Sequence, residues 1–117
     1  MIEHLLEGDW LLIEIDGEPV DPEAPRSILF EDGRVSGRVG VNRFTGTYST
    51  NGDVIGIGPV ASTRMAGPPE LMSLEHHFNT HLEGEHEISL GGDEMVLSGA
   101  DGAIRSTRNN QLYPEDL

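Results

Sequence analysis

The spacing of turn signals constrains the fold of this chain more than any other feature. Short apolar runs are interrupted by Asp-Gly, Asn-Gly and Gly-Gly pairs along most of the 117 residues. Such pairs typically join neighbouring antiparallel strands. The pattern therefore predicts a mainly antiparallel β protein, with strands at residues 10–15, 27–30, 34–39, 43–49, 53–57, 86–90, 94–97 and 103–106.

Glycines among the predicted strands indicate that the sheet is curved. Gly37, Gly40 and Gly46 fall where residues 34–48 otherwise alternate between apolar and polar side chains. A glycine weakens a strand unless the sheet bends there or another backbone comes close. We therefore expect a strongly curved, barrel-like sheet.

One segment has helical rather than strand periodicity. Residues 70–82 begin with an acidic residue, and a glycine, Gly84, follows shortly after their end, as is typical of a helix. The apolar positions recur at three- and four-residue intervals, at Leu71, Leu74, Phe78 and Leu82. With one helix and no linker, the chain is predicted to be a single domain over residues 1–117, with a core at about 8–106 and a polar C-terminal tail at 107–117.

The charge balance limits the partners to expect. The chain has 21 acidic and 7 basic residues, for a net charge of -14. Such a surface repels phosphate backbones and anionic lipid headgroups, so neither nucleic acid nor a membrane is expected as a partner. Another protein remains open as a partner, and we expect the chain to be a monomer.

Cysteine content and the first residues bear on the compartment. The chain has no cysteine, which excludes a disulfide framework and a cysteine-bound zinc site. Residues 1–7 lack the basic start and apolar run of a secretory signal, and no stretch approaches the ~20 apolar residues of a membrane span. A cytoplasmic location is therefore expected.

Two short segments resemble a known family. Residues 37–48 read GRVGVNRFTGTY and residues 61–66 read ASTRMA. Together with Trp10, Phe30, Glu75 and Phe78, they resemble the META domain, also called the heat-shock protein HslJ family. The resemblance implies a compact, strongly curved antiparallel sheet with a single helix covering one end. It also implies a non-enzymatic role in protein interaction or stress tolerance, without a cofactor and without assigned ligand-binding residues.

The chain departs from the family pattern at two positions. Many META relatives have cysteine where Val41 and Gly67 stand here. The resemblance implies that these positions form a bridge in envelope-located relatives, and a bridge has no use in a reducing compartment. The joint absence of both cysteines favours the cytoplasmic location.

Three polar residues of the motifs have a structural and a functional interpretation. Asn42 lies between two predicted strands, where asparagine tolerates turn conformations and bonds to neighbouring backbone. We expect Asn42 and Thr63 to hold loops together through local side-chain hydrogen bonds, in preference to forming a recognition site. Arg64 either pairs with a carboxylate of this acidic surface or holds an anionic ligand, and the pattern does not choose between them.

A pair of histidines on the predicted helix offers the one suggestion of metal chemistry. His77 and His81 lie four residues apart on one helical face and could hold zinc or copper if a third ligand came from elsewhere. Phe78 occupies the position at which a zinc-protease motif has its glutamate. We prefer to interpret both histidines as boundary residues of the apolar stripe, so no metal site is predicted.

Other catalytic and metal patterns are missing. There is no Gly-x-Ser-x-Gly nucleophile motif, and acidic residues are too numerous for any pair of them to indicate acid-base catalysis. Asp93 and Asp101 lie in glycine-rich turns that lack the closing glutamate of a calcium loop. The chain is therefore not expected to be an enzyme, and no catalytic residue is assigned.

Three functional hypotheses remain. The first is a non-enzymatic META-type module that binds another protein, whose sign would be an exposed apolar or arginine-bearing patch. The second is a small-molecule binder in which Gly37 and Gly46 leave a cavity inside the curved sheet. The third is a metal-dependent function at His77 and His81.

Overall fold

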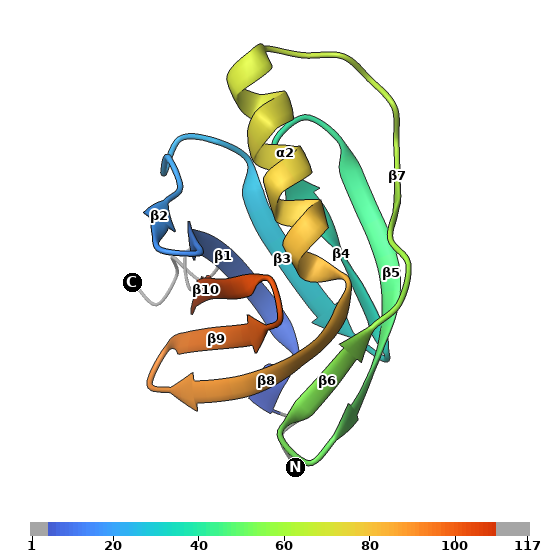
Figure 1. Ribbon diagram of the computed structural model, residues 1–117, viewed down its shortest axis with the longest axis vertical. Helices are drawn as coiled ribbons and strands as arrows, with labels where there is room; N and C mark the ends of the chain where they lie inside the picture. The colour runs from blue at the N-terminus through green and yellow to red at the C-terminus, as the bar shows by residue number, and fades with distance from the viewer. Residues whose placement is uncertain (1–4, 110–117) are drawn as a thin grey trace, which may run out of the picture.

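A computed structural model describes residues 5–109 of the chain. Its ten strands form one antiparallel sheet, and eight of them close into a barrel because the first and last also pair with each other (Figure 1). In their order around the barrel, these are β10 (Gly102–Arg108), β9 (Glu94–Gly99), β8 (Gly84–Gly91), β6 (Val54–Ile57), β5 (Arg43–Asn51), β4 (Arg34–Val39), β3 (Arg26–Glu31) and β1 (Gly8–Ile15). The predicted fold class is confirmed.

Two short strands lie outside the barrel and were not predicted. β2 (Glu18–Pro19) pairs with β1, and β7 (Ala61–Ser62) pairs with β5. At two residues each, they are too short to have a readable alternation. After β7 the chain passes over the end of the barrel to the helix α2 (Pro69–Leu82), one residue longer than predicted (Figure 1).

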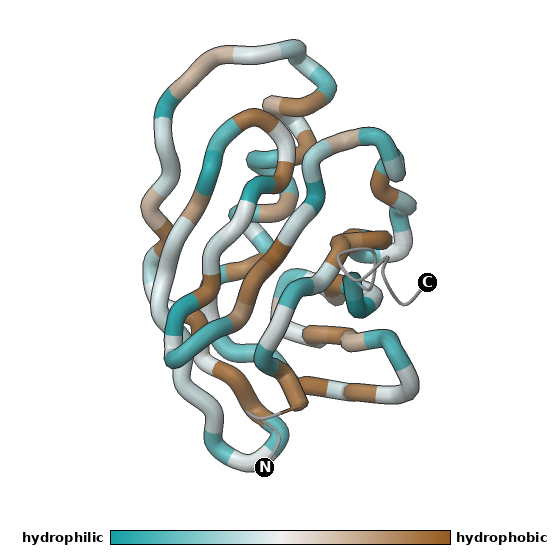
Figure 2. The backbone as a smooth tube through the Cα atoms, turned by 180° about the vertical axis from the view of Figure 1, so that it is seen from behind, coloured by the Kyte–Doolittle hydropathy of each residue, from teal (hydrophilic) through white to brown (hydrophobic). Residues whose placement is uncertain are grey.

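The predicted alternation produces one filled core. Figure 2 shows hydrophobic and hydrophilic residues alternating along the strands. On β4 and β5, for example, Val35 and Phe44 are buried while Arg34 and Arg43 are exposed. The helix adds two fully buried side chains, Phe78 and Leu82, to the core. Phe78 packs against Phe44 with ring centroids 5.3 Å apart, which fixes α2 against the barrel.

The C-terminal boundary differs from the expectation. β10 continues to Arg108, so residues 107 and 108, predicted to begin a polar tail, form part of the barrel. Their backbone groups pair with β1 through Leu11–Thr107 and Trp10–Arg108. Asn109 follows β10 and donates its backbone N–H to the carbonyl oxygen of Asp9 at 3.0 Å, and the rest of the predicted tail, residues 110–117, lies outside the described residues.

The motif glycines were attributed to curvature of the sheet, and at Gly37 the structure shows the other reason for a glycine in a strand, the close approach of another backbone. This residue has φ of 152°, and a Cβ atom there would collide with the backbone carbonyl oxygen of Ser27 on β3. We predict that Gly37→Ala lowers the free energy of unfolding by about 2 kcal/mol, because the backbones of β3 and β4 are both held in the sheet and cannot move apart without strain. Urea denaturation measures this change. Gly91→Ala is the matched control, since a Cβ atom there meets nothing within 4 Å, and an equal loss in both variants would contradict the explanation.

Candidate functional site

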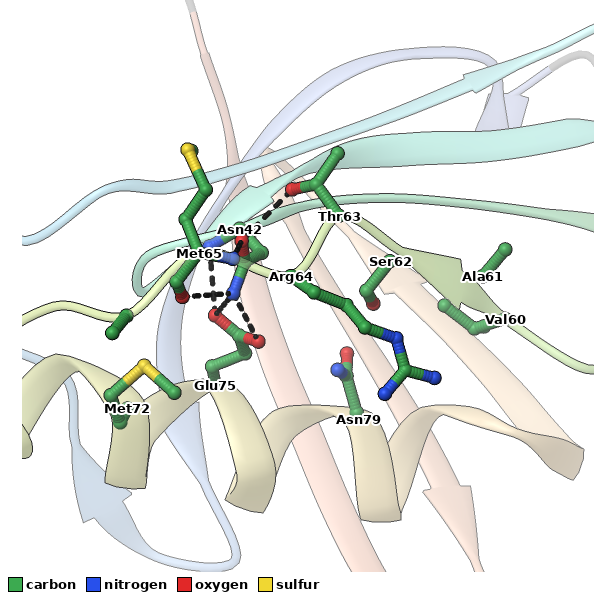
Figure 3. Close-up of a pocket in the computed structure, with 11 residues that line it drawn as sticks. Asn42, Val60, Ala61, Ser62, Thr63, Arg64, Met65, Met72, Glu75 and Asn79 are labelled. Atoms are coloured by element: carbon green, nitrogen blue, oxygen red, sulfur yellow. Dashed lines mark hydrogen bonds between the residues drawn. The ribbon is translucent and has the colours of Figure 1, made fainter.

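An open groove of about 580 Å³ lies between β7 and α2 (Figure 3). Its wall on the β7 side is formed by the segment 60–66, and its wall on the helix side by side chains one turn apart. The lining residues are Asn42, Val60, Ala61, Ser62, Thr63, Arg64, Met65, Ala66, Met72, Glu75 and Asn79. The groove therefore contains the whole second motif and part of the first.

A buried asparagine holds the floor of this groove. Asn42 is 4% exposed and is the last residue of the turn between β4 and β5. Its Oδ1 accepts hydrogen bonds from Thr63 Oγ1 at 2.9 Å and from the backbone N–H of Met65 at 2.7 Å. Its Nδ2 donates to the Met65 carbonyl oxygen at 3.1 Å. Asn42 thus binds the segment after β7 through both ends of its amide.

The helix reaches the same turn through Glu75. Its Oε1 accepts hydrogen bonds from the backbone N–H groups of Asn42 at 2.7 Å and Val41 at 3.1 Å. Asn42 Nδ2 also donates to Oε1 and Oε2, at 3.2 and 3.0 Å. Hydrogen bonds to an ionised carboxylate are stronger than neutral ones. Glu75 therefore ties α2, the β4–β5 turn and the segment 61–66 together.

The expected structural role of Asn42 and Thr63 is confirmed, with one change. The two side chains do bond to each other, and Thr63 also pairs with Arg43: its Oγ1 accepts from the Arg43 N–H at 3.1 Å, and its own N–H donates to the Arg43 carbonyl at 3.0 Å. These bonds join segments about twenty residues apart rather than closing each loop locally. Glu75, which completes the network, had no role assigned from the sequence.

Methionine and arginine side chains are among the exposed residues of the groove. Met65 is 56% and Met72 37% exposed, and they are two of the three exposed large hydrophobic residues in the described part of the chain. Arg64 extends across the groove toward Asn79 (Figure 3) and is exposed. Among residues 5–109 its guanidinium has no hydrogen bond and no carboxylate within 4.0 Å. The groove therefore has exposed side chains of both kinds, apolar and arginine, that were named as a sign of the first hypothesis.

The histidine pair of α2 does not assemble a metal site with its surroundings. His77 and His81 lie edge to face with ring centroids 4.7 Å apart, and His81 Nδ1 lies 2.9 Å from the carbonyl oxygen of His77. His81 Nε2 is buried and has no hydrogen-bond partner among residues 5–109. Over residues 5–109, no group of three or more His, Cys, Asp or Glu side chains is placed to hold a metal ion. Within the described residues, the structure brings the two histidines together but places no third ligand beside them.

The glycines proposed to leave an internal cavity do not leave one. A Cβ atom at Gly46 would lie 3.3 Å from Val60 Cγ2, and the position of a Cβ atom at Gly37 is already occupied by the backbone of β3. The interior beyond them is filled by a continuous cluster of buried side chains that includes Trp10, Phe30 and Phe78. The small size of these glycines serves close packing, not a ligand chamber.

The two positions singled out for their missing cysteines lie in contact. A Cβ atom built on Gly67 would be 3.5 Å from Val41 Cβ and 2.6 Å from Val41 Cγ2. Disulfides have Cβ–Cβ distances of about 3.5–4.5 Å. The inference that these positions can carry a bridge is therefore consistent with the geometry.

A closed antiparallel barrel with a helix against it, and a motif-lined groove beside that helix, define the class of protein. The sequence profile of the META domain family matches residues 3–111, and the chain belongs to this family. No curated protein sequence matched the chain. No helix in the described residues has the length and apolar character needed to cross a membrane.

Solved structures share the fold. One is an NMR structure with 23% sequence identity and a TM-score of 0.72, and the match covers 92% of this chain and 93% of that one. Another is the NMR structure of a protein from Burkholderia xenovorans, with 21% identity and a TM-score of 0.72, covering 92% of this chain and 86% of that one. At these identities the similarity establishes the fold alone.

Proposed function

We propose that this META-domain chain is a non-enzymatic interaction module that binds an extended segment of another protein in the groove between β7 and α2. The observation that carries the proposal is the exposure of Met65 and Met72 around a groove held rigid by Asn42 and Glu75. Methionine side chains adapt to varied apolar partners, and exposed apolar patches on single domains commonly mark interaction sites.

The free edge of β7 supports an extended partner. Within residues 5–109, β7 pairs with β5 along one side and with no strand along the other. An unpaired strand edge beside a groove with exposed methionine side chains can accept a further strand from a partner, whose alternate side chains then enter the groove. The partner segment that fits has an apolar side chain for Met72 and Val60, and a carboxylate for Arg64, which makes no ion pair within residues 5–109.

The remaining parts of the proposal follow from charge and composition. The net charge of -14 argues for a protein partner over nucleic acid or an anionic membrane. The missing cysteines at positions 41 and 67 argue for a reducing, cytoplasmic compartment. The proposal includes a monomeric state, and it includes a role in stress tolerance, which is what the family resemblance implies.

A library of short displayed peptides tests the groove directly. We expect selection on the folded protein to enrich extended apolar sequences that carry an acidic residue. Their affinity should fall about tenfold or more in Met72→Asp and in Arg64→Glu, because the first places a carboxylate in an apolar contact and the second repels the acid of the peptide.

The control is Arg34→Glu, which makes the same charge change at an exposed position of β4. Fluorescence anisotropy with labelled peptides measures the peptide affinity of the unchanged protein and of the three variants. Enrichment of no binding sequence, or an equal loss of affinity in Arg34→Glu and Arg64→Glu, would contradict the proposed site.

A further inference from the structure

Two arginine side chains lie next to each other on the outer face of β4 and β5. Arg38 and Arg43 are direct cross-strand partners, and both are exposed. Like charges placed opposite each other destabilise a sheet. The chain has 21 acidic and only 7 basic residues, so its composition would readily supply an acidic neighbour to neutralise each arginine. Departures from such local rules concentrate at functional sites.

Neither arginine is neutralised by the described part of the chain. The ion pairs within residues 5–109 are made by Arg105, with Glu14 and Glu94. Arg38 Nε donates to the carbonyl oxygen of Val41 at 3.1 Å, which leaves its terminal nitrogens available. The Arg43 guanidinium has no hydrogen bond or ion pair within the same residues. Two guanidinium groups therefore face solvent together.

The surroundings of the pair supply further donors. Both arginines line a depression of about 420 Å³ that also contains the hydroxyl-bearing residues Ser27 and Ser36. Ser27 is the cross-strand partner of Arg38 on β3. Asp9 is the one carboxylate in this lining, and its negative charge would repel an anion bound there. The depression shares no lining residue with the groove between β7 and α2.

We propose that Arg38 and Arg43 form a binding site for a small oxyanion, either the phosphate or the carboxylate group of a small molecule. The planar guanidinium binds such groups through paired hydrogen bonds, and the neighbouring serine hydroxyls add neutral donors. The net charge of -14 disfavours a polyanion, because the rest of the acidic surface repels those of its charges that lie away from the two arginines. This inference is independent of the proposed function.

Nitrogen-15 NMR of the arginine side chains tests the site. Inorganic phosphate is added at constant ionic strength, with chloride as the counter-experiment. We expect saturable shifts at Arg38 and Arg43 with a Kd on the order of 1 mM. Arg43→Gln should weaken binding about tenfold or more, because charge-assisted hydrogen bonds are lost. Asp9→Asn should strengthen it about twofold, because a repelling charge is removed.

The matched control is Arg34→Gln, which removes an arginine of the same strand outside the depression and should leave the Kd unchanged. Acetate and phenyl phosphate, titrated in parallel, distinguish a carboxylate from a phosphate ligand, and saturation by any of the three supports the site. Drift that does not saturate and is equal at Arg34 and Arg43 would mean an adventitious ion only. That result, or unchanged binding in a folded Arg43→Gln variant, overturns the proposal.

Discussion

Replacing Glu75 by alanine is expected to lower the free energy of unfolding by about 3 kcal/mol. Its carboxylate accepts from two backbone N–H groups and from the side-chain amide of Asn42. Asn42 and Val41 are buried, so their donors lose a charged partner that water replaces only in part. Glu75→Gln should cost less, because an amide oxygen can still accept from both backbone groups.

Denaturant unfolding measures this loss, and Glu70→Ala is its control on the first turn of the same helix. We expect the free energy of unfolding of the control to fall by about 0.5 kcal/mol, because only the favourable interaction of Glu70 with the helix dipole is lost. Amide hydrogen exchange gives a second readout, since the Glu75 variant should exchange faster at Met65, whose N–H is held by Asn42. Equal stability losses at positions 70 and 75 would contradict the role assigned to Glu75.

The double variant Val41→Cys with Gly67→Cys is expected to form a disulfide. Oxidation should raise its free energy of unfolding by about 3 kcal/mol. The Cβ–Cβ distance of 3.5 Å fits a bridge, and the loop it closes sets the size of the gain. Its Tm should rise by about 10 °C over the reduced form of the same variant. Differential scanning calorimetry with and without reductant measures the change.

Single replacements sharpen this experiment. Gly67→Ala alone should destabilise the protein, because its Cβ atom would meet Val41 Cγ2 at 2.6 Å, whereas cysteine at position 41 removes that methyl group. A double variant that stays reduced under oxidising conditions, or melts at the same temperature in both redox states, would show that the two positions are not adjacent in solution.

Local signals were sufficient to predict the barrel. Turn pairs and alternation placed each of its eight strands, because both signals depend on residues close in sequence. The motif glycines predicted the curved sheet, although at Gly37 the glycine is required because the backbone of β3 occupies the space of a side chain. β2 and β7 were missed since two residues carry no periodicity, and the end of β10 was missed because Thr107 and Arg108 are polar residues paired at the barrel seam.

The site was harder to predict because its bonds join distant segments. Asn42 and Thr63 were recognised as structural, yet the partner that organises them lies on the helix, 33 residues beyond Asn42. Glu75 was noted as part of the family resemblance, but as one of 21 acidic residues it has no local pattern that indicates which groups it bonds to. The exposure of Met65 and Met72 is equally a tertiary property, since apolar residues in a sequence are expected in the core.

Methyl NMR of methionine-labelled protein tests the central claim, that the groove between β7 and α2 is a protein-binding site. The chain supplies its own control, because Met65 and Met72 border the groove while Met95 is 1% exposed in the core. On addition of the selected peptides, the account predicts that the Met65 and Met72 methyl signals shift and that Met95 stays in place. Peptide binding that leaves both groove methionines unchanged would contradict it.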